Sequence, residues 1–213
     1  MHPSARAFPF LAVPYIAAMA VVVSASNWLV QYQFDHFGLR DILTWGAFTY
    51  PVAFLVNDLA NRHHGPRVAR MAVLAGFVLA VAISVWLASP RIAIASGTAF
   101  LLAQLLDTQV FHAMRRRSWW QAPLVSTVLG SALDTALFFF IAFSASFAFI
   151  DVATGMEDGS LTFGVPFLGA EVPLWVSLAV GDLLVKLATG LVMLAPYGVI
   201  VRGSLAGSFA ERS

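Results

Sequence analysis

Five ionisable side chains lie inside long apolar stretches of this sequence. They are Asp58, Asp107, Asp134, Asp182 and Lys186. A charge at the centre of a lipid bilayer costs ~3 kcal/mol on insertion scales, so such residues normally face a protein interior or a wet cavity. By default they mark the path of a polar solute or an ion. The chemistry that these residues offer is therefore binding and neutralisation of a cargo.

Asp182 and Lys186 are four residues apart, a spacing that places both on one face of a helix. They form either a salt bridge that fixes helix packing or a pair that opens when a solute or a proton binds. Asp58 has the same spacing from Arg62. If all were ionised, four aspartates against one lysine would leave a charge of −3 in the membrane. Protons, a basic solute or arginines from the loops must neutralise this excess.

Further polar residues accompany the buried aspartates. Gln104 lies three residues before Asp107, so an amide and a carboxylate share a helix face and can hold donors and acceptors of one polar ring. Asn57 and Asp58 either belong to such a site or close a helix ahead of a basic loop. Asp134 lies in a stretch with small residues at four-residue intervals, which let helices approach closely in lipid.

The composition is that of an integral membrane protein. Of 213 residues, 60% are hydrophobic and 11% are charged, and the mean hydropathy is +0.82. A soluble domain has about 25% charged residues. No cysteine is present, which excludes disulfides, thiol catalysis and cysteine zinc sites. We therefore expect one all-α transmembrane domain that covers residues 1–213.

Six apolar stretches are long enough to cross about 30 Å of hydrocarbon as helices. Their approximate limits are 8–30, 44–61, 68–88, 92–112, 122–148 and 174–200. The second is the weakest, because Pro51 interrupts it. The first resembles a signal peptide, but its length favours a retained helix. The polar connection at 149–173 is long enough for a short ordered element.

The distribution of basic residues predicts the topology, because cytoplasmic loops carry an excess of Lys and Arg. One side collects nine arginines: Arg6, Arg62, Arg67, Arg70, Arg115, Arg116, Arg117, Arg202 and Arg212. The other side has Arg40 and Arg91. Both termini are therefore expected in the cytoplasm. Trp45 lies near a segment end, where it either sits in the headgroup layer or stacks on a planar solute.

Motifs of common enzymes are missing from the sequence. It contains no HExxH, GxSxG, Walker A or DDxxD pattern, and His63 and His64 are adjacent, which is a poor metal geometry. Two close carboxylates could still form an aspartyl-type site if Asp107 and Asp134 met across a helix interface. We expect no catalytic residue, no metal and no cofactor. A membrane scaffold without transport activity is a third class of function.

Several short motifs together resemble the queuosine precursor transporter family (the vitamin uptake transporter group). They are NWLVQ at 27–31, TWGAFTYP at 44–51, NDL at 57–59, QLLD at 104–107, DT at 134–135, Lys186, and PYGV at 196–199. The resemblance covers most of the chain. It implies a six-helix fold similar to the substrate-binding subunits of energy-coupling-factor vitamin importers. It also implies uptake of 7-cyano- and 7-aminomethyl-7-deazaguanine across a bacterial inner membrane, for salvage into tRNA queuosine.

A 7-deazaguanine has two adjacent N–H donor groups on one edge, which one carboxylate can accept. The expected binding residues are Asn27, Trp45, Asn57, Asp58, Gln104, Asp107 and Asp134. Asp107 and Asp134 are the alternatives for the ring edge. A second Asp suits the cation of an aminomethyl form. Lys186 paired with Asp182 would orient these carboxylates or relay a proton.

The expected partners are a small purine-like solute and the lipid bilayer, with no nucleic acid; a homo-oligomer is left open. A solitary carrier is the first expectation, and a subunit of an ATPase-driven importer is the alternative. Subunits of that kind often show an Ala-x-x-x-Ala contact in the first helix. No two of the alanines at 12, 17, 18, 20 and 25 are four apart, which favours the solitary carrier.

Overall fold

Long apolar segments become helices in this chain, because a helix satisfies every backbone polar group without water. The computed structural model describes residues 8–29, 32, 34–36 and 44–210. Within these residues, five helices are long and apolar enough to cross a membrane. They are α1 (Phe8–Leu29), α4 (Pro66–Leu87), α5 (Pro90–Met114), α6 (Gln121–Phe143) and α8 (Leu174–Ala210). The chain is therefore a mostly helical, multi-pass membrane protein.

The second apolar stretch forms two shorter helices, α2 (Gly46–Thr49) and α3 (Pro51–His64). Pro51 has no N–H to donate, so it interrupts the hydrogen-bond ladder. Tyr50 between them keeps helical dihedrals, with φ −58° and ψ −39°. The 14 residues of α3 rise only about 21 Å at 1.5 Å per residue, less than a hydrocarbon core of about 30 Å. For this reason α3 alone is not among the five long helices.

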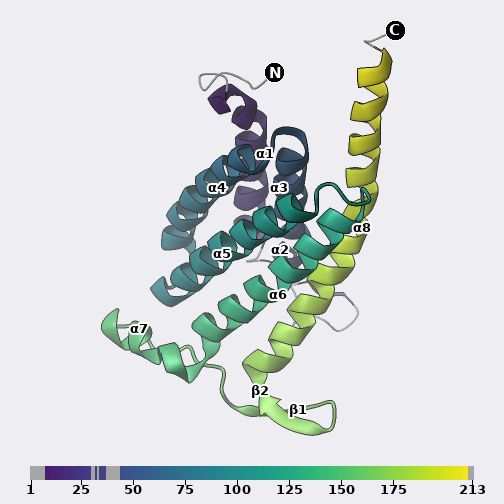
Figure 1. The fold of residues 1–213 in the computed structure, drawn as a ribbon. Coiled ribbons are helices and arrows are strands. Elements are labelled where there is room, and N and C mark those ends of the chain that lie inside the picture. Colours follow the sequence, from purple (N-terminus) through teal and green to yellow (C-terminus); the bar gives the residue numbers. More distant parts are fainter. Residues whose placement is uncertain (1–7, 30–31, 33, 37–43, 211–213) are drawn as a thin grey trace.

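The helices pack in two connected groups (Figure 1). On one side α1 packs against α3 and α4, and on the other α6 packs against α5 and α8. Small residues allow the close approach: a Cβ added at Gly130 of α6 would lie 2.7 Å from Cε1 of Phe54 in α3. The first turn of α1 and the last turn of α8 lie at the same end of the bundle (Figure 1).

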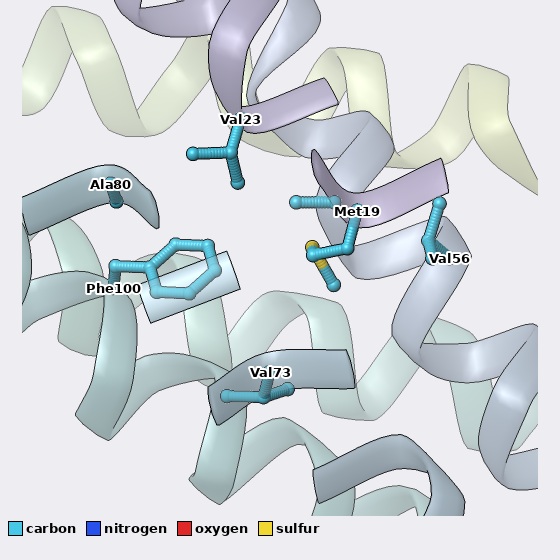
Figure 2. Close-up of a cluster of buried hydrophobic side chains, with 7 residues drawn as sticks. Met19, Val23, Val56, Val73, Ala80 and Phe100 are labelled. Atoms are coloured by element: carbon cyan, nitrogen blue, oxygen red, sulfur yellow. The ribbon is translucent and has the colours of Figure 1, made fainter. Parts of the chain in front are cut away.

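A cluster of apolar side chains from α1, α3 and α4 also includes a residue of α5, and so joins the first group to the second. Figure 2 shows Met19, Val23, Val56, Val73, Ala80 and Phe100 converging between these helices. Close packing is evident at Gly76 of α4, where an added Cβ would lie 2.6 Å from Cγ of Met19. The cluster contains no polar side chain.

The predicted helix over 122–148 is too long at its C-terminal end. α6 ends at Phe143, because Ser144 is extended (ψ 139°) and its hydroxyl accepts a hydrogen bond from the backbone of Ser146. A 3-10 turn, η1 (Ala145–Phe147), and a short helix, α7 (Ala148–Ala153), follow. An antiparallel hairpin of β1 (Gly164–Phe167) and β2 (Ala170–Pro173) precedes α8. The expectation of an ordered element within 149–173 is thus confirmed.

A buried ion pair joins the segment 145–173, which lies between α6 and α8, to the helix bundle. The sequence placed Arg91 in a loop, whereas its side chain is 1% exposed at the start of α5. It lies 2.6 Å from Asp151 of α7, which is 3% exposed. Arg91 also donates to the carbonyls of Ile141 and Ser144 at the end of α6. The arginine therefore joins α5, α6 and α7, which is a structural role that its sequence position does not reveal.

Candidate functional site

A cavity of about 140 Å³ lies between the two groups of helices. For scale, a protein cavity of about 150 Å³ holds a benzene ring. Its wall contains residues of α1, α2, α4, α5, α6 and α8. They are Val23, Ser26, Asn27, Thr44, Gly46, Ala47, Tyr50, Ala80, Ser84, Ser96, Ala99, Phe100, Asp134, Phe138, Asp182 and Lys186. We call this cavity the chamber.

One wall of the chamber carries three of the charged residues. Nζ of Lys186 lies 2.6 Å from Oδ2 of Asp134 and 2.5 Å from Oδ2 of Asp182. The predicted pairing of Asp182 with Lys186 is therefore confirmed, and the structure adds Asp134 from a different helix. Thr135 donates a hydrogen bond of 2.7 Å to Oδ2 of Asp182. The lysine thus joins α6 to α8 and orients both carboxylates.

These three residues differ in exposure. The side chains of Asp134 and Lys186 are 4% and 6% exposed, while that of Asp182 is 18% exposed. Two carboxylates and one ammonium carry a net charge of −1 when all are ionised, and the surrounding low dielectric strengthens their effect on a cargo. Tyr50 adds a ring whose centroid lies 5.6 Å from the ammonium. The wall therefore attracts hydrogen-bond donors and cations, with Asp182 the most accessible member.

The opposite wall offers neutral polar groups and aromatic rings. Asn27 donates to the Val23 carbonyl at 2.9 Å and accepts from the Ser84 hydroxyl at 3.3 Å. The Ser26 hydroxyl donates to Thr49. Flat rings line the space between the walls. They are Tyr50, Phe100 and Phe138. The chamber thus combines a charged edge with faces suited to a planar polar molecule.

Four of the predicted binding residues lie elsewhere, in a polar cluster between α3, α5 and α6. Asn57 donates to Oδ2 of Asp107 at 2.8 Å and to the Gln104 carbonyl at 3.1 Å. Ser126 donates to Oδ1 of Asp58 at 3.2 Å. All five side chains are buried. We call these residues the buried cluster; none of them lines the chamber.

Two pairings left open by the sequence are not formed. Among the described ion pairs none joins Asp58 to Arg62, whose guanidinium instead donates to the Tyr197 hydroxyl at 3.0 Å. The aspartates considered for an aspartyl-type site have different partners, because Asp107 contacts Asn57 while Asp134 contacts Lys186. Among the described residues, Asp58 therefore forms no ion pair with Arg62, and Asp107 and Asp134 each bind a different partner.

Trp45 lies beside the chamber but does not line it. Its side chain is 41% exposed and packs edge-on against Phe34, with ring centroids 4.9 Å apart. Sequence reasoning missed Tyr50, Ser26 and Ser84, which do line the chamber. Tyr50 had one usable signal, because it directly precedes the proline that interrupts the second stretch. Within the described parts of the chain, no group of three or more His, Asp or Glu residues could hold a metal.

Long apolar helices around a charged, ring-lined chamber are typical of membrane transporters for small solutes. The chain belongs to the vitamin uptake transporter family, since the family described as "Putative vitamin uptake transporter" matches residues 44–89 and 84–200. No solved structure matches the chain.

Three relatives carry the same kind of name. The chain is 38% identical to the "Queuosine precursor transporter" of Escherichia coli, over 58% of this chain and 64% of that protein. It is 30% identical to the "Probable queuosine precursor transporter" of Haemophilus influenzae, over 84% of this chain and 82% of the relative. A Bacillus subtilis protein with that same name is 29% identical over 50% of this chain and 58% of its own length. The chain thus matches less than two thirds of the E. coli and B. subtilis proteins.

Proposed function

We propose that this protein imports queuosine precursors, the 7-cyano- and 7-aminomethyl-7-deazaguanines, and that it acts as a solitary carrier. One observation carries the proposal: two carboxylates share one ammonium on the wall of a chamber lined by flat rings. The names of the E. coli and H. influenzae relatives support the same class of cargo. The protein does this as a carrier without catalytic chemistry.

The ring edge of a 7-deazaguanine binds to Asp182 in this proposal. Thr135 and Lys186 both bind Oδ2 of Asp182, so Oδ1 is the oxygen left to accept from a cargo. Two adjacent N–H groups on one carboxylate are charge-assisted bonds, which are about twice as strong as neutral ones. The rings of Phe100 and Phe138 cover the faces of the heterocycle.

Lys186 stabilises the carboxylates of the wall both in the empty chamber and in the chamber with bound cargo. In the empty chamber it neutralises parts of both Asp134 and Asp182. When the cargo donates to Asp182, the ammonium keeps its 2.6 Å contact with the more buried Asp134. An aminomethyl cargo adds a positive charge that offsets the net −1 of the wall, while a cyano cargo uses the hydrogen bonds alone. The same chamber therefore takes both forms.

The proposed topology has six crossings. The short helices α2 and α3 together form the second crossing, and α1, α4, α5, α6 and α8 form the others. Both termini lie in the cytoplasm of a bacterium, and the arrangement is similar to the substrate-binding subunits of energy-coupling-factor importers. The chamber lies near the C-terminal ends of α1, α4 and α6, away from the loops that contain most arginines. It is therefore at the outer half of the inner membrane.

The test is precursor salvage by cells that cannot synthesise 7-deazaguanines. We expect queuosine in their tRNA to depend on this protein when external precursor is limiting. Cells that carry Asp182→Asn should make little queuosine under these conditions, while cells that carry Glu157→Gln, a matched change at an exposed acid outside the long helices, should make as much as with the wild-type protein. Queuosine that appears equally without the protein contradicts the proposal. Co-purification with an ATPase that uptake requires would favour the importer-subunit alternative over a solitary carrier.

A further inference from the structure

The buried cluster brings two carboxyl groups together without a cation. Asp58 of α3 is 2% exposed and Asp107 of α5 is 0% exposed. Asn57, which directly precedes Asp58 in the sequence, donates to Asp107, so both carboxyl groups belong to one polar cluster. Asn57 and Ser126 hold one oxygen of each. None of the ion pairs between described residues includes either aspartate.

The charged and titratable groups of the surrounding helices have other contacts. Arg62 of α3 binds Tyr197 of α8, His63 of α3 binds Tyr15 of α1, Lys186 of α8 binds Asp134 of α6, and His112 of α5 is exposed. Helix α4 presents the apolar Val68 and Ala69 to α3. Arg62 attracts the Asp58 carboxylate but, among the described residues, forms no ion pair with it. Two buried carboxylates in one cluster, neither with a described ion-pair partner, are costly to ionise together, so the pair holds one proton.

Some hydrogen-bonding groups of the buried cluster have no partner among the described residues. Gln104 is 0% exposed, and neither Oε1 nor Nε2 of its amide has a hydrogen-bond partner. It lies three residues from Asp107, on the same face of α5, and Oδ1 of Asp107 is also unpaired. Each such group costs about 1–3 kcal/mol when buried without a partner. These unpaired atoms of Gln104 and Asp107 are free to form hydrogen bonds when α3 and α5 change their arrangement.

A small space borders one member of the pair, Asp58. A space of about 10 Å³ touches Asp58 and is bordered by Thr127, Met193 and Tyr197. This is about the room that one water molecule needs. The space suits a proton carried by water and leaves no room for a larger ligand.

We propose that Asp58 and Asp107 form a proton-binding pair that couples solute uptake to the inward movement of one H⁺. The proposal rests on the transport function above. With one shared proton the pair closes the contact between α3 and α5. When the carboxyl O–H bond breaks, the proton leaves through the water-sized space and two carboxylates remain. Their repulsion opens the α3–α5 contact, and a proton from outside restores it in the next cycle.

The experiment uses the purified chain in lipid vesicles, with neutral 7-cyano-7-deazaguanine as the labelled probe and the membrane potential clamped at zero. With the outside one pH unit more acidic, we expect about tenfold accumulation, because one pH unit corresponds to about a factor of ten for one proton. A dye inside the vesicles should report acidification that accompanies uptake. Asp107→Asn should exchange labelled for unlabelled probe but no longer accumulate it. Glu157→Gln should accumulate it as the wild-type protein does.

The outcomes separate this proposal from the proposed function. Wild-type vesicles that exchange the probe but show neither accumulation nor internal acidification would overturn the coupling and leave transport intact. Accumulation by Asp107→Asn at the wild-type level would overturn it as well. Vesicles with wild-type protein that neither exchange nor take up the probe overturn the transport function, and the coupling with it. The wild-type measurement decides even if the variant fails to fold.

Discussion

Lys186 of α8 binds Asp134 of α6 at 2.6 Å, across 52 positions of sequence. The same ammonium also binds Asp182 on its own helix, so two helices and the wall of the chamber depend on one cation. Removal of one partner from a buried ion pair is far more damaging than replacement of both, because the remaining charge stays buried without compensation. Lys186 therefore contributes both to the stability of the helix bundle and to the charge of the chamber wall.

The first prediction concerns the removal of this cation. Lys186→Met leaves two adjacent carboxylates and should lower the free energy of unfolding by about 3–5 kcal/mol. Adding Asp134→Asn should restore more stability than adding Asp182→Asn, because Asp134 is 4% exposed and Asp182 is 18% exposed. Thermal unfolding of the purified proteins in detergent measures this order. The opposite order of rescue would show that Asp182, not Asp134, is the main buried partner.

The second prediction distinguishes two residues that the sequence proposed together. Asn27 lines the chamber and Trp45 does not. Asn27→Ala should raise the KM for precursor uptake by about 3- to 10-fold, since one hydrogen bond contributes about 0.5–1.5 kcal/mol. Trp45→Phe should leave the KM unchanged. A larger KM for Trp45→Phe than for Asn27→Ala would place the bound solute outside the chamber.

The third prediction tests the close helix contact at Gly130. An added methyl group would lie 2.7 Å from Cε1 of Phe54, a ring that is 1% exposed. Gly130→Ala should therefore destabilise the protein by about 1–3 kcal/mol through overpacking. The control is Gly203→Ala in α8, where nothing lies within 4 Å of an added Cβ. There we expect a gain of about 0.5–1 kcal/mol from the better helix former; equal shifts in unfolding temperature would contradict the contact.

The fourth prediction concerns the ion pair that joins the segment 145–173 to the helix bundle. Asp151→Ala leaves Arg91 buried without its 2.6 Å partner, so we expect a loss of about 3–5 kcal/mol and faster proteolysis near residue 155. Arg91→Met with Asp151→Ala should be milder than Asp151→Ala alone. If the double variant is cleaved and unfolds just like the single one, the ion pair is not what fastens this segment.

Asp158 provides a matched control for that experiment. Its carboxylate is 56% exposed and 3.5 Å from Arg91. Hydrogen bonds from the Ser160 hydroxyl and amide, with Arg91 nearby, hold the pKa of Asp158 below its ordinary value. A lowered pKa means that any stabilisation is present at neutral pH and is lost only as the pH falls through that value. Asp158→Asn should therefore change proteolysis little at pH 7, and a large change would contradict this assignment.

The sequence predicted those features that depend on local spacing. The Asp182–Lys186 pair follows from a separation of four residues, and the long helices follow from apolar length. The end of α6 was missed because hydropathy continues past Phe143, while the extended backbone of Ser144 leaves no trace in apolar content. The weakness of the second stretch was correctly attributed to Pro51.

Contacts between helices could not be obtained in this way. Asp134 joins Lys186 from another helix, and nothing in one sequence specifies which buried aspartate does so. Asn57 donates a hydrogen bond of 3.1 Å to the backbone carbonyl of Gln104, yet both residues belong to the buried cluster and neither lines the chamber. Arg91 was assigned to a loop because charge counting records the side of the membrane, not the burial of a side chain.

Equilibrium binding of labelled 7-aminomethyl-7-deazaguanine to the purified chain tests the central claim most directly. We predict saturable binding at one site per chain that weakens about 10- to 100-fold in Asp182→Asn, the effect of one charge-assisted contact of about 1.5–3 kcal/mol. Glu157→Gln should bind as the wild-type protein does. Undiminished binding by the folded Asp182→Asn variant, or no binding by the wild-type chain, would contradict the account.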